Sequence, residues 1–117
     1  MAIKHLRIIL TGFMGTGKTA VGAALAKKLG YDFLDTDLMI EEETGKTVTE
    51  IFEKEGEPSF RGYEKKMLKK ALDREKVVVA TGGGAIVDPE NLKLMKGRGV
   101  VVGLSADPES IFKRVAE

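Results

Sequence analysis

The chain has 117 residues, and 19 basic and 18 acidic residues leave a net charge of +1. This balance provides no strong electrostatic field that would select nucleic acid or an anionic membrane as a partner. The absence of cysteine excludes disulfides, thiolate zinc sites and thiol nucleophiles. No apolar stretch approaches the roughly 20 residues that span a bilayer, and no apolar leader with a cleavage site is evident. We therefore expect a single domain in the cytoplasm.

Strand and helix signals alternate along the chain, which is typical of an α/β fold with a parallel sheet and helical crossovers. The expected strands cover residues 7–11, 32–36, 77–81 and 99–104. The expected helices cover residues 19–29, 38–43, 47–55 and 59–73, with two more beginning at Pro89 and Pro108. In the first helix, the four-residue spacing of Val21, Leu25 and Leu29 predicts the buried face.

The most specific motif is Gly12-Phe13-Met14-Gly15-Thr16-Gly17-Lys18-Thr19, which fits the phosphate-binding pattern G-x-x-x-x-G-K-[ST]. It follows a predicted strand and opens a predicted helix, as this pattern requires. Glycines let backbone amides surround phosphate oxygens, and the helix N-terminus favours the same anion. Lys18 adds a mobile positive charge, and the Thr19 hydroxyl is suited to Mg²⁺. The residues expected to bind the nucleotide are Gly15, Thr16, Gly17, Lys18, Thr19 and Ala20.

Two aspartates, Asp35 and Asp37, lie at the carboxyl end of the second predicted strand. Ligands of open parallel sheets bind outside this edge. One carboxylate could therefore serve a metal ion while the other accepts a hydrogen bond from an acceptor hydroxyl. The third strand ends in Thr81 where many phosphate-loop proteins carry an acidic residue, so we assign the metal to Asp35. The alternative is a structural role, with Asp37 capping the helix that begins at Leu38.

Two further features point to an acceptor site. Three consecutive glycines, Gly82, Gly83 and Gly84, are costly in a folded chain unless the backbone must approach a ligand closely. Arg61 near the start of a long helix could pair bidentately with a carboxylate or phosphate. The alternatives are a flexible turn for the glycines and a solvated surface side chain for Arg61. The pairs Lys65-Lys66 and Lys69-Lys70 are expected to be solvated.

In order and spacing, the phosphate loop, Asp35-x-Asp37, Phe60-Arg61-x-x-Glu64 and Thr81-Gly82-Gly83-Gly84 resemble the shikimate kinase family. The resemblance covers the whole chain and implies transfer of phosphate from ATP to the 3-hydroxyl of shikimate. It also implies a three-layer α/β/α fold with a parallel sheet of order 2-3-1-4, in which the fifth strand of the family's sheet would be missing from this chain.

The resemblance implies roles for individual residues. Lys18 would hold the β- and γ-phosphates, and Thr19 and Asp35 would hold Mg²⁺. Asp37 would bind the shikimate hydroxyls and take the proton from the attacking one. Arg61 would pair with the shikimate carboxylate, while Gly82, Gly83 and Gly84 would line the pocket.

The family pattern continues for about 50 residues beyond Glu117, including a lid arginine of the kind worth about 10³ to 10⁵ in rate in phosphoryl transfer. We therefore expect the chain as written to be nearly inactive. We also expect a monomer whose fourth strand forms an edge that could associate. The alternative functions are a phosphate- or nucleotide-binding fragment without turnover, and a kinase of another hydroxylated acceptor such as gluconate.

Overall fold

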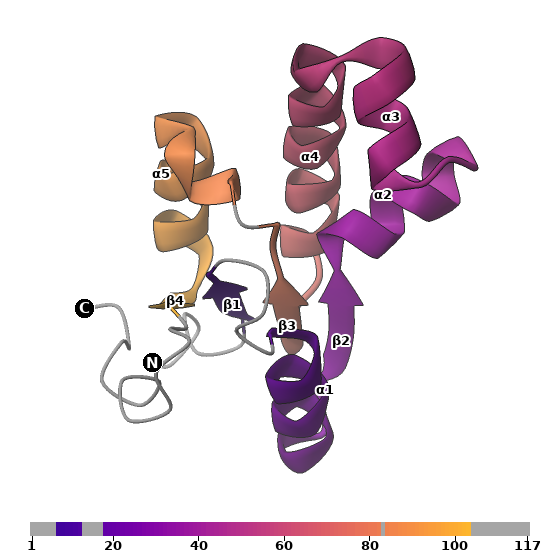
Figure 1. The fold of residues 1–117 in the computed structure, drawn as a ribbon. Coiled ribbons are helices and arrows are strands. Elements are labelled where there is room, and N and C mark those ends of the chain that lie inside the picture. The colour runs from indigo at the N-terminus through magenta and orange to yellow at the C-terminus, as the bar shows by residue number, and fades with distance from the viewer. Residues whose placement is uncertain (1–6, 13–17, 83, 104–117) are drawn as a thin grey trace.

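The computed structural model describes residues 7–12, 18–82 and 84–103. Within them, four parallel strands form one sheet in the order β2-β3-β1-β4 (Figure 1). The strands are β1 (Arg7–Thr11), β2 (Asp32–Asp35), β3 (Val77–Ala80) and β4 (Val100–Gly103). The expected fold class and strand order are both confirmed.

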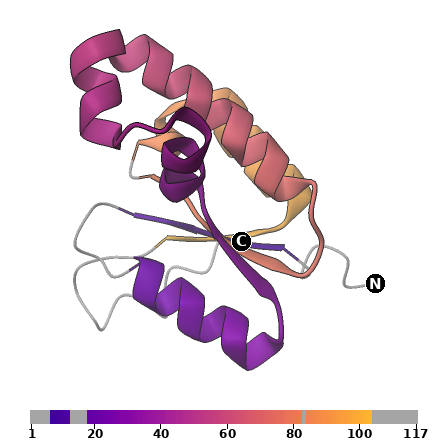
Figure 2. The same ribbon diagram turned by 90° about the vertical axis from the view of Figure 1, so that its right-hand side faces the viewer.

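The helices form a layer on each face of this sheet (Figure 2). They are α1 (Lys18–Leu29), α2 (Thr36–Thr44), α3 (Val48–Glu55), α4 (Glu57–Leu72), the short 3₁₀ helix η2 (Ala85–Val87) and α5 (Pro89–Arg98). Helix α1 covers one face, and α4 and α5 cover the other (Figure 2). None of the described helices is both long and apolar enough to cross a membrane. The helix expected from Pro108 lies outside the described residues.

The register of the sheet places the carboxyl ends of β1, β2 and β3 side by side. Ala80, the last residue of β3, lies opposite Leu10 on one side and Asp35 on the other. Because all strands are parallel, the segments that follow β1, β2 and β3 emerge at one edge. The phosphate loop, the aspartate pair and the triple glycine follow these strands in the sequence.

The core lies between β3 and the helical layer formed by α4 and α5. Every residue of β3 is buried, as expected for a strand covered on both faces. Leu68 and Leu72 of α4 are fully buried against this strand, together with Met95 of α5. The predicted buried face of α4, which also includes Phe60, Met67 and Ala71, is confirmed.

The predicted buried face of α1 is wrong in part. Leu29 is 44% exposed, whereas Gly22 and Ala26 are the buried residues of this helix. A Cβ on Gly22 would lie 2.4 Å from Cε1 of Phe33, so the helix approaches the sheet through its smallest residues. Leu29 is the last helical residue, and Gly30 turns the chain with a φ of 73°. The close approach places the packing on Gly22 and Ala26 and leaves Leu29 outside it.

Candidate active site

The described part of the phosphate loop is Gly12 and the residues from Lys18 onward; Gly15, Thr16 and Gly17 lie outside the described residues. Lys18 begins α1, and its Nζ donates a hydrogen bond to the Gly12 carbonyl oxygen. Burial lowers the pKa of Lys18, and the nearby carboxylates of Asp37 and Asp35 oppose this shift. Lys18 therefore places a partly desolvated cation beside both aspartates of the motif.

Asp35 links the phosphate loop to the start of α2. Its Oδ1 accepts hydrogen bonds from the backbone amides of Asp37 (2.9 Å) and Leu38 (3.2 Å), which makes Asp35 the N-cap of α2. Its Oδ2 accepts a hydrogen bond from Oγ1 of Thr19 at 3.2 Å. The expectation that Asp37 caps a helix beginning at Leu38 is therefore wrong. Because the extended backbone of Asp35 lets its carboxylate reach the first-turn amides, Thr36 joins the helix instead of the strand.

Asp37 lies in the first turn of α2 with its carboxylate largely buried. Among the residues that the structure describes, its buried Oδ1 has no hydrogen-bond partner. Burial raises the pKa of Asp37 and the charge of Asp35 raises it further, while Lys18 opposes the shift. Freed from capping, this carboxylate is available as an acceptor for a ligand hydroxyl.

Arg61 is held between two glutamates on its own helix. Its Nη1 donates a hydrogen bond to Oε1 of Glu64 at 2.9 Å, and its Nε donates to Oε2 of Glu57 at 3.3 Å. The guanidinium carbon also lies 5.4 Å from the centroid of the Phe60 ring, within the range of a cation–π contact. Its side chain is 38% exposed. Arg61 is thus a fixed cation with an open side, and it is not a freely solvated surface residue.

The glycines after β3 allow the charged groups to converge. A Cβ on Gly82 would lie 2.9 Å from Oδ1 of Asp37 and 3.1 Å from Oε2 of Glu64. A Cβ on Gly84 would lie 2.7 Å from both terminal nitrogens of Arg61. The φ of Gly84 is −95°, which any residue can adopt, so close approach is what requires glycine there. Gly83 lies outside the described residues.

Glu64 is the site residue that sequence reasoning left without a role. It is 1% exposed, and its Oε2 has no hydrogen-bond partner among the described residues. Burial raises the pKa of Glu64, against the lowering effect of its hydrogen bond with Arg61. Its place three residues after Arg61 on a helix was the available signal, because residues at this spacing are neighbours on the helix surface.

Thr81 supports the same edge of the sheet. Its Oγ1 and its backbone nitrogen both donate to the carbonyl oxygen of Leu10, each at 3.0 Å. The residue that replaces the expected acidic group therefore connects the ends of β3 and β1.

Comparison with known proteins identifies the family to which these motifs belong. A family model described as shikimate kinase matches residues 14–117. The chain is 51% identical over 108 residues to the shikimate kinase of Pelotomaculum thermopropionicum, covering 92% of this chain and 63% of that protein. The chain belongs to the shikimate kinase family.

Other shikimate kinases agree in sequence and structure. That of Thermodesulfovibrio yellowstonii is 48% identical, with 94% of this chain and 64% of that protein covered. The structure of shikimate kinase from Acinetobacter baumannii in complex with shikimate superposes with a TM-score of 0.86 at 46% identity, covering 96% of this chain and 63% of that one. The chain thus spans less than two thirds of the length of these relatives.

A gluconokinase from Sinorhizobium meliloti, at 19% identity and a TM-score of 0.54, shares the fold alone.

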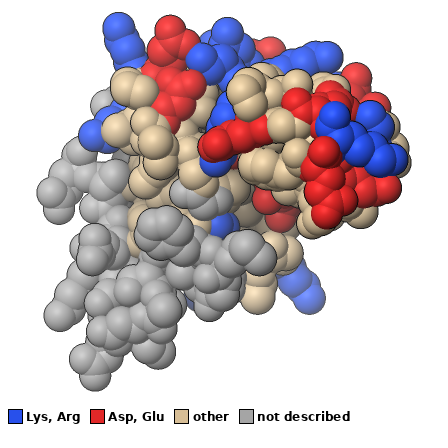
Figure 3. Space-filling view, turned by 45° about the horizontal axis from the view of Figure 1, so that its top comes forward, with Lys and Arg blue, Asp and Glu red and all other residues tan. Residues whose placement is uncertain are grey.

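The described surface of the chain carries both signs of charge. Figure 3 shows acidic and basic side chains interspersed over the face that it presents. Lys65, predicted to be solvated, instead pairs with Asp88 at 3.2 Å and with Glu90, which joins α4 to α5. Lys66 pairs with Glu43 at 3.8 Å. The expectation of solvation is therefore confirmed for Lys66, Lys69 and Lys70, which are exposed, and is wrong in part for Lys65, which is half-buried and paired.

Proposed function

We propose that this chain belongs to an enzyme that transfers the γ-phosphoryl group of ATP to the 3-hydroxyl of shikimate, giving shikimate 3-phosphate and ADP. The observation that carries the proposal is the convergence of Asp37, Arg61 and Glu64 on Gly82 and Gly84. This cluster combines a cation for a carboxylate with an acceptor for a hydroxyl, and shikimate carries both groups. Lys18 lies close enough to Asp37 for each to shift the pKa of the other.

In this proposal, the nucleotide occupies the start of α1. The backbone of Gly15, Thr16 and Gly17 with Thr19 and Ala20 would surround the phosphates, and Lys18 would neutralise charge on the transferred group. Lys18 would have to exchange its hydrogen bond with the Gly12 carbonyl for the phosphate oxygens.

Arg61 would bind the shikimate carboxylate through its exposed side. Glu57 and Glu64 hold the guanidinium in one orientation, so little conformational freedom remains to be lost on binding. Gly82, Gly83 and Gly84 would form the backbone wall of the pocket. The absence of side chains at Gly82 and Gly84 lets Asp37 and Arg61 lie against this wall.

Asp37 would act as the catalytic base. The 3-hydroxyl oxygen forms a bond to the γ-phosphorus, the bond from that phosphorus to the β,γ-bridging oxygen breaks, and the hydroxyl proton passes to Asp37. A pKa raised by burial makes this carboxylate a better proton acceptor than an exposed aspartate. Positioning and charge neutralisation supply most of the remaining acceleration.

The residues present fit a magnesium ion bound with the nucleotide. Oγ1 of Thr19 and Oδ2 of Asp35 are hard oxygen donors 3.2 Å apart. Mg²⁺ commonly takes one or two protein oxygens and fills its other positions with phosphates and water. When bound, the ion supplies neutralisation of the phosphate charge. The described residues include no group of three or more acidic or histidine side chains placed for a metal. The proposed protein ligands are therefore one hydroxyl and one carboxylate, from Thr19 and Asp35.

A coupled assay for ADP in the presence of Mg-ATP, run on the longer enzyme to which we propose this chain belongs, tests the proposal. In that enzyme we expect ADP release that depends on shikimate, with gluconate inactive as an acceptor; residues 1–117 alone should turn over little. Lys18→Ala should abolish ATP binding, whereas Asp37→Asn should keep ATP binding and lower kcat by about 10² to 10⁴, the usual contribution of a general base. Preference for gluconate would refute the substrate assignment. Calorimetric binding of ATP without shikimate-dependent ADP release would support a nucleotide-binding chain without turnover.

We further propose a single-domain cytoplasmic monomer that binds neither nucleic acid nor membranes. The low net charge supports this proposal. Light scattering coupled to gel filtration tests it: a monomer mass is expected. A stable dimer would instead point to association through β4, one of the two outer strands of the described sheet.

A further inference from the structure

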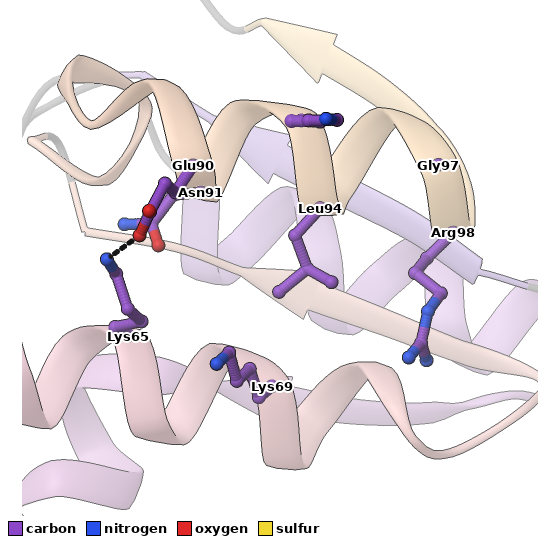
Figure 4. Close-up of a pocket in the computed structure, with 8 residues that line it drawn as sticks. Lys65, Lys69, Glu90, Asn91, Leu94, Gly97 and Arg98 are labelled. Carbon is purple, nitrogen blue, oxygen red and sulfur yellow. Dashed lines mark hydrogen bonds and ion pairs between the residues drawn. The ribbon is translucent and has the colours of Figure 1, made fainter.

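A cavity lies away from the residues proposed for catalysis. It has a volume of about 490 Å³ and lies between α4 and α5 (Figure 4). This volume falls within the usual range for small-molecule sites, about 300 to 1,000 Å³. We call it the α4–α5 groove; it is lined by Lys65, Lys69, Glu90, Asn91, Lys93, Leu94, Gly97 and Arg98.

The groove concentrates positive charge in a nearly neutral protein. Four of its eight lining residues are basic and one is acidic, whereas the whole chain has a net charge of only +1. Lys65 is paired with Asp88 and Glu90, and Arg98 is paired with Asp73 at 3.6 Å, so the uncompensated charge of the lining comes from Lys69 and Lys93. Such a local excess attracts anions even where the total charge does not.

The two ends of the groove are held by internal contacts. At one end, Lys65 pairs with Glu90 and Asp88. At the other end, Arg98 donates to the Leu72 carbonyl oxygen at 3.1 Å. Figure 4 shows Leu94 extending toward α4 between these ends. These contacts fix the distance between the helices, so the groove is present before a ligand arrives.

Two exposed lysines between these ends are available for a ligand. Within the part of the chain that the structure describes, Lys69 of α4 and Lys93 of α5 have no ion-pair partner. Lys69 belongs to α4 and Lys93 to α5, the two helices that border the groove. An anion between the helices could therefore contact both charges.

Asn91 provides an independent sign of a missing partner. It is 2% exposed and lines the groove on the side of α5 that faces α4 (Figure 4). Its Nδ2 donates to the Ala85 carbonyl oxygen at 3.1 Å, which fixes the orientation of the amide. Its buried Oδ1 has no donor among the described residues. Buried acceptors of this kind are normally satisfied, so Oδ1 of Asn91 lacks a donor that a ligand hydroxyl or an ordered water would supply once the side chains that cover it move aside.

We propose that the α4–α5 groove binds a small metabolite that carries a phosphate or carboxylate group together with a hydroxyl. The anionic group lies between Lys69 and Lys93, and the hydroxyl satisfies Oδ1 of Asn91 directly or through one water. Because neither lysine belongs to the proposed phosphoryl-transfer site, the groove is separate from the nucleotide and acceptor positions.

Nuclear magnetic resonance titration of the chain at constant ionic strength tests this proposal. The probes are glycerol 3-phosphate and malate, with sodium chloride as the control for charge screening. Saturable shifts of the amides of residues 93–97 with either probe are expected. Shifts of the amides of residues 18–20 would report the phosphate loop separately, so failure of one site is distinguishable from failure of the other.

Two variants with opposite expected effects make the test specific. The double variant K69A/K93A should weaken binding at the groove by about tenfold or more, because it removes two charge-assisted contacts. The matched control K27A/K28A removes the same charge from α1 on the opposite face and should leave the affinity unchanged. Glu90→Gln removes the only carboxylate of the lining and leaves Lys65 paired with Asp88 at 3.2 Å, which keeps this end of the groove closed, so it should tighten binding.

Shifts that increase linearly with both probes, or equal weakening in the two double variants, would show nonspecific attraction and overturn the proposal. Weaker binding by Glu90→Gln would also contradict it.

Discussion

Replacing Gly82 with alanine adds one methyl group at the point where the buried oxygens of the half-buried Asp37 and of the buried Glu64 converge. The new Cβ would lie 2.9 Å from Oδ1 of Asp37 and 3.1 Å from Oε2 of Glu64. Ordinary contacts of a Cβ begin at 3.4 Å, so these oxygens must retreat by 0.5 and 0.3 Å. Neither oxygen has a hydrogen-bond partner among the described residues that would resist the movement. The substitution therefore displaces the proposed base more than it disrupts the fold.

The size of the effect follows from this displacement. A misplacement of about 1 Å in an active site can cost about 100-fold in rate. A shift of half that size should therefore lower kcat/KM for shikimate by about tenfold, equivalent to about 1.4 kcal/mol of transition-state stabilisation. Overpacking of a buried position costs about 1 to 3 kcal/mol, so the variant should remain folded.

The coupled ADP assay and calorimetric titration with shikimate measure the effect, while the KM for ATP should stay unchanged. Gly62→Ala is the matched control, because Gly62 lies on α4 beside Arg61 and a Cβ there would meet nothing within 4 Å. This control should keep kcat/KM within about twofold, and alanine should favour the helix by about 1 kcal/mol. An unchanged kcat/KM in Gly82→Ala, or an equal loss in Gly62→Ala, would refute the reasoning.

Three further predictions concern recognition, pH dependence and the core. Arg61→Lys should raise the KM for shikimate by about 10- to 100-fold, because an ammonium cannot make the planar bidentate contact; an unchanged KM would remove Arg61 from the carboxylate site. Glu64 has a raised pKa in the folded state, so its contribution to stability is fully present below the unfolded pKa of about 4.3 and is lost as pH rises through the folded pKa. Glu64→Gln should therefore flatten the decline of the unfolding free energy with rising pH, measured by urea denaturation, and an unaltered pH profile would contradict this assignment. Leu72→Ala should lower the unfolding free energy by about 2 to 5 kcal/mol, since Leu72 is fully buried in the main core; a change below about 1 kcal/mol in the same denaturation experiment would show that the core collapses around the gap.

Local patterns predicted most of the fold because local chemistry determines it. The apolar run of β3 and the helix start at Asp88-Pro89 depend on neighbouring residues, and both occur where expected. The capping box of Thr47 and Glu50 also forms as the sequence indicates. The buried face of helix α1 differs from the prediction because it depends on how closely the helix approaches the sheet. Phe33 of β2 contacts the helix at Gly22 and sets this approach.

The sequence by itself determined the family, the strand order implied by it, and the types of charged group at the site. Only the tertiary structure shows how these groups are arranged. Asp35 caps α2, and among the described residues Oδ1 of Asp37 has no hydrogen-bond partner, while the buried Glu64 bonds Arg61. The contacts of Gly82 with Asp37 and of Gly84 with Arg61 join segments that are far apart in the chain. No local pattern reports such distances, since they arise only when parallel strands bring their carboxyl ends to one edge of the sheet.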